Sequence, residues 1–161
     1  MELIELTLAH SLSVVGRMRE KDRACVLAML GDISDEEFAA NRWQSYGPAW
    51  ALLDDSGNPQ AIGGMTLPNG WTGVMWLVVA EGLPRESWRK LIRHTRTVIA
   101  NATDPRNEAF RHRIEAHVLD GWGGAQRLVE SLGFQMEGIR RAAGRNGENV
   151  QQWAIVCPVK G

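Results

Sequence analysis

Three ionisable side chains of this sequence stand where acid–base chemistry can occur. Glu115 and His117 are two residues apart in an alternating segment, so in a strand their side chains share one face. An imidazole with a carboxylate beside it can take up and return a proton near neutral pH. Glu81 directly follows a long apolar run and could act as a base at the end of a strand. The simpler alternatives are a solvated Glu81 and a hydrogen-bonded, structural His117.

Other kinds of catalytic site have no counterpart in the sequence. There is no Ser-His-Asp order, no spacing of metal ligands and no Walker loop. Cys25 and Cys157 lie far apart and outside any CxxC pattern, which is typical of free thiols in a reducing cytoplasm. We therefore expect neither a bound metal nor a disulfide.

The composition is that of a globular protein with one domain, residues 1–161. Hydrophobic residues make up 44%, charged residues 23%, and the formal net charge is -1. This near-neutral charge argues against nucleic-acid binding through an overall positive potential. The acidic N-terminus is unlike a signal peptide, and no apolar run approaches the ~18–20 residues of a membrane span. We expect a cytoplasmic protein without membrane or nucleic-acid partners.

Strands and helices must alternate along this chain to hold these side chains. Period-two alternation and short apolar runs predict strands at 3–8, 50–53, 60–67, 72–80, 113–119, 135–142 and 151–156. Helices are expected after an N-cap at Ser11, at Pro84 and at Gly123, and the first helix continues or restarts at 25–30. A capping box at Ser34 predicts another helix, which should run to about Trp43 and bury that ring. The run 72–80 is apolar on both faces, which is typical of a central strand.

The segment 114–134, IEAHVLDGWGGAQRLVESLGF, is the most specific part of the sequence. An alternating strand is followed by a glycine-bearing loop, an amphipathic helix and Gly133, which suits the left-handed residue that ends a helix. A helix ending in RLVESLGF before a strand with EGIRR resembles the C-terminal half of the GCN5-related N-acetyltransferases, or GNAT proteins. The expected order, β-α-α-β-β-β-α-β-α-β-β, extends this resemblance over nearly the whole chain. It implies an α/β (α+β) fold with a mixed, mostly antiparallel, twisted sheet flanked by helices.

Parts of the chain are more similar to GNAT-like proteins of short-tailed bacteriophages and prophages. The segments that carry this likeness are MREKDR, WALLDDSGNPQAIGG, and WLVVAEG followed by a basic helix. Several of those proteins have no established reaction. A catalytically silent binding or structural protein is therefore the alternative to an enzyme.

The GNAT resemblance implies that acetyl-CoA binds as co-substrate where the fourth and fifth strands separate. On that pattern Val78 and Val79 hold the pantetheine arm through main-chain bonds, and Trp122 flanks the arm. The resemblance also implies an acetyl transfer to an amine, with Glu81 or His117 assisting deprotonation. The sequence does not identify the acceptor amine.

Two positions of the GNAT pattern depart from the family. The diphosphate loop, R/Q-x-x-G-x-G/A, falls on PRESW at 84–88, which holds no glycine. Gly82 could be a displaced remnant, and Arg85 and Ser87 could meet phosphate instead. A tyrosine that protonates the CoA thiolate in many family members is matched by Val129, which cannot donate a proton. An enzyme, a silent scaffold and a non-catalytic acyl-CoA sensor therefore all remain open, and the resemblance also suggests a homodimer.

Overall fold

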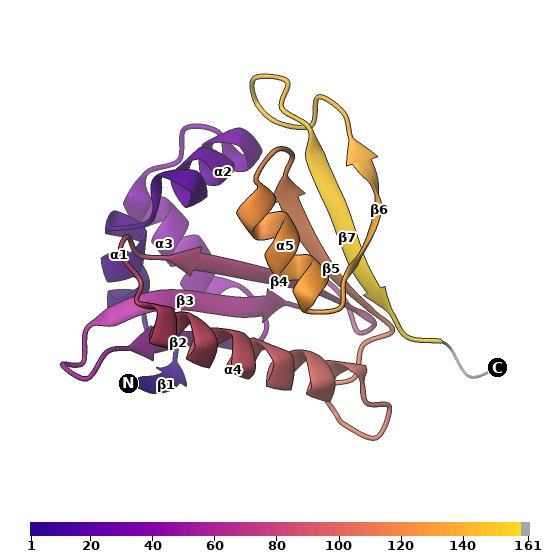
Figure 1. Cartoon of the computed structure of the whole chain (residues 1–161), viewed down its shortest axis with the longest axis horizontal. Helices are drawn as coiled ribbons and strands as arrows, with labels where there is room; N and C mark the ends of the chain where they lie inside the picture. The colour runs from indigo at the N-terminus through magenta and orange to yellow at the C-terminus, as the bar shows by residue number, and fades with distance from the viewer. Residues whose placement is uncertain (159–161) are drawn as a thin grey trace.

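The computed structural model describes residues 1–158, and within them one seven-stranded sheet carries helices on both faces (Figure 1). The strands are β1 (Glu2–Glu5), β2 (Ala49–Leu53), β3 (Pro59–Thr66), β4 (Thr72–Val79), β5 (Arg113–Leu119), β6 (Gln135–Arg140) and β7 (Val150–Val156). The helices are α1 (Leu8–Gly16), α2 (Glu20–Leu30), α3 (Asp35–Gln44), α4 (Arg85–Thr103) and α5 (Gly123–Ser131). No helix within residues 1–158 combines the length and the apolarity that a membrane crossing needs.

The strand order of the sheet is β1-β2-β3-β4-β5-β7-β6. Only β4 and β5 pair in parallel, and the other five neighbouring pairs are antiparallel. The predicted mixed, mostly antiparallel sheet is therefore confirmed. The apolar run 72–80 forms the central strand β4, as its continuous hydrophobicity indicates.

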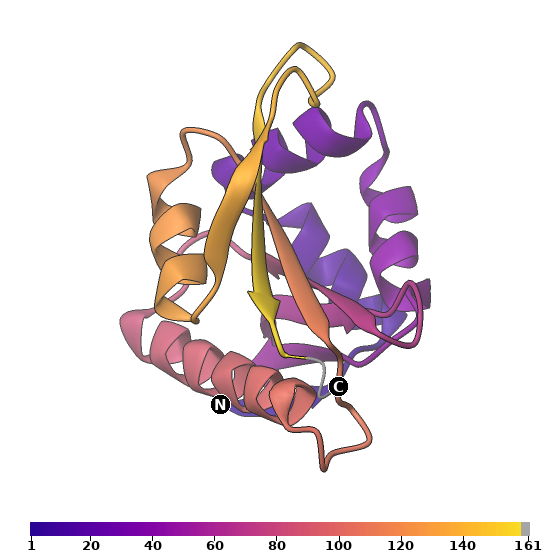
Figure 2. The ribbon, with the colours of Figure 1, turned by 90° about the vertical axis from the view of Figure 1, so that its right-hand side faces the viewer.

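Two layers of helices cover the sheet, as Figure 2 shows edge on. Helices α1 and α3 bury Val14, Val15 and Phe38 against Ile62 and Val78, and Val26 of α2 packs against this cluster. On the opposite face α4 and α5 lie against the sheet, with apolar residues of both helices in the core. These are Leu91, Ile99 and Ala102 of α4 and Val129 of α5. Successive side chains of a strand point to opposite faces, so each central strand contributes to both cores.

In the first third of the chain, one of the two predicted helix N-caps is confirmed. Ser34 and Glu37 form the predicted capping box. The N-cap of α1, however, is Thr7 and not Ser11, so the helix begins earlier and β1 ends at Glu5. Ser11 is buried inside α1, where its hydroxyl donates to the Ala39 carbonyl at 2.8 Å. The apolar run 25–30 belongs to a separate helix, α2, which adds one helix to the expected order.

The prediction that α3 buries Trp43 is wrong, because this side chain is 45% exposed. The buried stripe of α3 contains Phe38 and Ala39. Arg42 follows Phe38 by four residues and therefore lies on the same side of the helix. Its guanidinium stands 5.6 Å from the Phe38 ring. Arg42 therefore packs on the side of α3 where the sequence analysis expected Trp43.

Short-range signals in the second half are confirmed with small shifts. Strand β5 has the predicted bounds, and Gly133 has φ +96° at the end of α5. Phe134 then returns to the core at 3% exposure. Pro84 is the N-cap of α4 instead of its first helical residue. Strand β6 ends at Arg140, short of the predicted 142.

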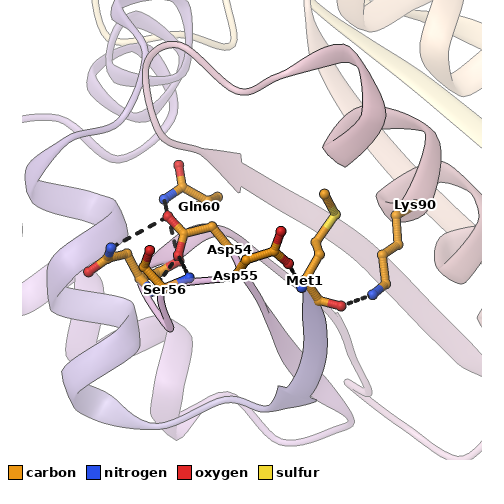
Figure 3. Close-up of polar contacts among 7 residues, drawn as sticks. Met1, Asp54, Asp55, Ser56, Gln60 and Lys90 are labelled. Carbon is orange, nitrogen blue, oxygen red and sulfur yellow. Dashed lines mark hydrogen bonds and ion pairs between the residues drawn. The ribbon is translucent and has the colours of Figure 1, made fainter.

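The predicted DDSGN turn joins β2 to β3 and also contacts the N-terminus (Figure 3). The Asp54 carboxylate accepts hydrogen bonds from the main-chain N–H groups of Ser56 and Asn58, both at 2.9 Å. These N–H groups, that of Asn58 foremost, lower the pKa of Asp54. The Met1 amino group pairs with Asp55, while its carbonyl accepts from Lys90 of α4. The turn, β1 and α4 are thereby linked at one edge of the sheet.

A glycine in the α3–β2 connection offers a sharp test of this packing. Gly47 has φ +132°, and a Cβ at this position would lie 2.0 Å from the Met65 carbonyl oxygen. We expect Gly47→Ala to lower the free energy of unfolding by about 2–4 kcal/mol. Gly16→Ala is the matched control, because no atom lies within 4 Å of its Cβ. Urea unfolding of both variants measures the difference, and equal stabilities would contradict the packing of Gly47.

Candidate functional site

The sheet opens between β4 and β5. Their parallel register runs from Thr72–Arg113 through Gly73–Ile114 to Val74–Glu115 and then stops. Strand β4 continues to Val79 with β3 as its partner, and β5 continues to Leu119 with β7. The two strands therefore diverge toward their carboxyl ends, as Figure 1 shows. Main-chain groups along both inner edges lose their sheet partners there.

A cavity of about 630 Å³ occupies this opening and reaches both faces of the sheet. The face covered by α4 and α5 contributes Trp88, Leu91, Ile92, Ala125 and Leu128. The face covered by α2 and α3 contributes Val26, Met29, Leu30, Phe38 and Arg42. Residues 74–78 of β4 and 116–118 of β5 form the walls between these two halves. We call the halves the α4–α5 channel and the α2–α3 chamber.

The direction of the main-chain groups along β4 decides which of them face the opening. The Ala80 N–H donates to the Gln60 carbonyl of the β3 side at 2.9 Å. Successive residues of a strand direct their N–H and C=O groups to opposite edges. Val78 therefore faces β3, where it is in register with Ile62, whereas Leu77 and Val79 face the opening.

The start of α2 closes the wide end of the opening. The Arg19 N–H donates to the Val79 carbonyl at 3.0 Å, and the Val79 N–H is a hydrogen-bond partner of the Asp22 carboxylate. On the other strand the Cys25 thiol lies in contact with the main chain of Leu119. Both main-chain groups of Val79 are thus engaged, and Leu77 retains an N–H and a C=O that face the cavity.

A cation lies at the mouth of the α4–α5 channel. The Arg19 guanidinium stands 5.1 Å from the Trp88 ring and 5.5 Å from the Trp122 ring. Its Nε donates to the Asp22 carboxylate at 2.6 Å. Burial raises the pKa of Asp22, while the hydrogen bond and charge of Arg19 oppose that rise. Trp88 and Trp122 line the cavity and leave its interior open.

An ordered row of charged side chains leads along β5 to His117. The Glu115 carboxylate lies 3.4 Å from His117 Nε2, and its other oxygen accepts from Arg113 Nε at 2.6 Å. Arg113 also binds Glu137 of β6, and these carboxylates raise the pKa of Arg113 while that of Glu137 is lowered. His117 lines the cavity and lies on the opposite face of β5 from the apolar residues that pack on α5. A carboxylate that holds an imidazole in this way fixes the orientation of the ring.

The other sequence-predicted residues lie around the opening and not inside it. Glu81 is exposed beyond β4, and its N–H donates to the Arg17 carbonyl at 2.8 Å. Gly82 is exposed with φ +77°, which suits a glycine. Arg85 is exposed at the first residue of α4, whereas Ser87 is 2% exposed. These four residues, with Val78, Val79, His117 and Trp122, remain predictions as functional residues.

Three residues that line the cavity were not identified in the sequence analysis. Arg19 and Asp22 belong to the segment MREKDR, to which the sequence analysis gave no site residue, and Arg42 lies in the helix predicted after Ser34. The spacing of Arg19 and Asp22 suits an ion pair within one turn. No pattern in the sequence indicates that Trp88 and Trp122 meet Arg19. Within residues 1–158, no three His, Cys, Asp or Glu side chains gather as a metal site requires.

Comparison with known proteins gives structural matches only. No protein-family model matches the sequence, and no curated protein matches it significantly. The structure is similar to a predicted acetyltransferase from Acinetobacter baylyi, with TM-score 0.73, 15% identity, and 99% and 96% of the two chains covered. The ribosomal-protein-S18-alanine N-acetyltransferase of Escherichia coli gives TM-score 0.70 at 18% identity, with 99% and 96% covered. A spermidine N-acetyltransferase mutant of Vibrio cholerae gives 0.68 at 15%, with 97% and 95% covered.

These matches place the chain in the GNAT fold, as the sequence analysis expected. At such low identities the likeness extends to the arrangement of strands and helices and not to the reaction. The opening between β4 and β5 lies where the sequence analysis expected the acyl-CoA slot of this fold.

Cys25 provides a chemical probe of the chamber. Burial raises the pKa of its thiol to about 11. The thiolate is the reactive form, so in a Cys157→Ser variant the rate of alkylation by iodoacetamide should rise about tenfold per pH unit from about pH 7 to about pH 9.5. Mass spectrometry of the labelled peptide measures this rate. A plateau near about pH 8.5, as for an ordinary thiol, would show that Cys25 is not buried here.

Proposed function

We propose that this chain, which has the GNAT fold, transfers an acetyl group from acetyl-CoA to an amine. The observation that carries the proposal is the cavity through the β4–β5 opening. It joins an apolar channel on one face of the sheet to a separate chamber on the other. A thioester arm and an amine can therefore approach the same point from opposite faces, which is the arrangement that direct transfer needs.

The α4–α5 channel suits the pantetheine arm of acetyl-CoA. A cavity of about 630 Å³ lies in the range of small-molecule sites. Its walls include Leu91, Ile92 and Leu128, and the main-chain groups of Leu77 face it. An amide-bearing, largely apolar arm can bind there by strand-like hydrogen bonds and by burial of apolar surface. This role for Leu77 replaces the one that the sequence analysis gave to Val78.

The diphosphate would bind at the mouth of the channel. The N-termini of α4 and α5 both lack a side-chain cap, so N–H groups of their first turns remain available to an anion, except that of Gly123, which donates to the Gly121 carbonyl. Arg19 adds a guanidinium between Trp88 and Trp122. Glu86 in the first turn of α4 opposes an anion, whereas the first turn of α5 holds no acidic residue. We therefore assign the diphosphate to Arg19 and the α5 N-terminus.

His117 is the base that this arrangement favours. The amine nitrogen attacks the thioester carbonyl carbon, and the C–S bond breaks as the new C–N bond is completed. The proton lost by the nitrogen passes to His117, and the sulfur leaves as CoA thiolate. The Glu115 carboxylate lies 3.4 Å from Nε2, which leaves Nδ1 to face the amine. Because Val129 lines the cavity in place of a proton donor, the thiolate takes its proton from water.

The second candidate is a protein that binds an acyl-CoA-like ligand without turnover. One observation favours it: Val129, at the position of the tyrosine that donates a proton in many transferases of this fold, is apolar and lines the cavity. The likeness to phage-encoded GNAT-like proteins stays a prediction and adds no support to either candidate. The two candidates share the ligand site and differ in whether thiol is released.

Calorimetric titration tests the ligand site and the role of Arg19 together. We expect acetyl-CoA and desulfo-CoA to bind in the micromolar range, and Arg19→Gln to weaken both by tenfold or more. Acetyl-pantetheine lacks the diphosphate, so its affinity should be the same in wild type and Arg19→Gln. Stronger acetyl-CoA binding by Arg19→Gln would mean that Arg19 obstructs the mouth. Absence of heat with every ligand would end the acyl-CoA assignment.

Thiol release with a panel of amines tests the base. We expect His117→Gln to reduce kcat by about 10²–10⁴-fold with little change in KM for acetyl-CoA. The variant Glu81→Gln tests the other base that the sequence analysis proposed. If Glu81→Gln loses kcat and His117→Gln keeps it, the role belongs to Glu81. Ligand binding without thiol release from any amine would favour the second candidate.

A further inference from the structure

Arg42 is the charged side chain of the α2–α3 chamber that has no carboxylate partner within residues 1–158. Its guanidinium stands 5.2 Å from the Trp76 ring and 5.6 Å from the Phe38 ring. Its Nη2 donates to the Asn41 side-chain oxygen at 2.9 Å. Its Nε is buried and meets no acceptor among the described residues.

The other charges that line the cavity are differently placed. Arg19 is paired with Asp22, and His117 has the Glu115 carboxylate beside it. Arg127 of α5 also lines the cavity, but it is exposed and lies on the α4–α5 side. Arg42 is half-buried, and the loss of hydration lowers the pKa of its guanidinium. A ligand carboxylate would supply the acceptor that the described residues do not provide. In the absence of a ligand, the rings of Phe38 and Trp76 stabilise the guanidinium.

We propose that Arg42 binds a carboxylate of the acceptor, which makes the acceptor an amino acid with an apolar side chain. This rests on the proposed function, because it assigns the α2–α3 chamber to the acceptor. The planar guanidinium presents paired N–H groups that match the two oxygens of a carboxylate. Apart from the bond of Nη2 to Asn41, no hydrogen bond to a described residue occupies the N–H groups of this guanidinium, so its terminal N–H groups can donate to the two carboxylate oxygens.

The rest of the chamber agrees with this ligand chemistry. Its walls are formed by apolar side chains, among them Val26, Met29 and Phe38, which suit an aliphatic or aromatic side chain. His117 lines the same cavity and supplies the base for the amino group. A second positive charge on the ligand would be repelled by Arg42, so polyamines are disfavoured. The chamber thus distinguishes an amino acid from an amine of equal size by charge.

Three ligands that share an aromatic ring and an amine test whether the protein recognises the carboxylate. L-phenylalanine, L-phenylalaninamide and 2-phenylethylamine share the aromatic ring and the amine, and only the first carries the carboxylate. Ligand-observed NMR without acyl-CoA measures their binding, so this test does not depend on turnover. We expect L-phenylalanine to bind at least tenfold more tightly than the other two. Equal binding of the three, or no binding of L-phenylalanine, overturns the proposal.

Substitutions then assign the preference to Arg42. Arg42→Gln should abolish the difference between L-phenylalanine and its amide, and Arg42→Lys should keep part of it. Arg141→Gln, which removes an exposed arginine that does not line the cavity, should leave the preference unchanged. Preserved discrimination in Arg42→Gln overturns the proposal.

Thermal unfolding separates a ligand-binding arginine from a structural one. Because Arg42 lacks a carboxylate partner, Arg42→Met should melt at the same temperature as wild type or higher, and a large loss of stability would contradict a ligand-binding role. The carboxylate site and the transferase activity can also be disproved separately. Arg42-dependent binding without thiol release leaves the carboxylate site and removes the transferase. Acetyl transfer that is equally fast for acid and amide, and unaffected by Arg42→Gln, leaves the transferase and removes the carboxylate site.

Discussion

The end of β4–β5 pairing after Val74 and Glu115 is the constraint on which the rest of the structure depends. Each strand keeps its outer partner, so the sheet remains continuous while its centre opens. Main-chain groups on the two inner edges must then find other partners, because unpaired buried N–H and C=O groups cost free energy. At the wide end α2 supplies these partners. Deeper in the opening the groups of Leu77 face the cavity, where a ligand with amide groups can bind.

The start of α2 combines three tasks in one short segment. Its main chain pairs with Val79, its Asp22 carboxylate contacts the same residue, and its Arg19 side chain reaches Trp88 and Trp122. The buried Asp22 is held by Arg19, so the pair closes the sheet and also presents a cation at the channel mouth. Arg42, in contrast, has no such carboxylate among the described residues. We propose that Arg19 serves a phosphate-binding side of the cavity and Arg42 a carboxylate-binding side.

Local patterns in the sequence predicted the elements well, because caps and periodicity act over a few residues. The Ser34 box, the bounds of β5 and the Gly133 end of α5 depend only on neighbours in the chain. The functional details depend on residues far apart. Whether Val78 or Leu77 faces the opening follows from the register with β3, which no local pattern contains. The contact of Arg19 with Trp122, and the packing of Arg42 on Trp76 while Trp43 is exposed, likewise arise only when distant segments pack.

We propose that an acyl-CoA lodges between β4 and β5 and bonds to the inner edge of β4. Amide hydrogen exchange of Leu77, measured by NMR with and without desulfo-CoA, distinguishes a ligand inside the opening from one outside it. We expect the ligand to slow exchange of the Leu77 N–H at least tenfold, whereas Val78, whose groups face β3, should exchange at an unchanged rate. Binding of desulfo-CoA with no change at Leu77 would overturn this proposal, because the ligand would then lie outside the opening.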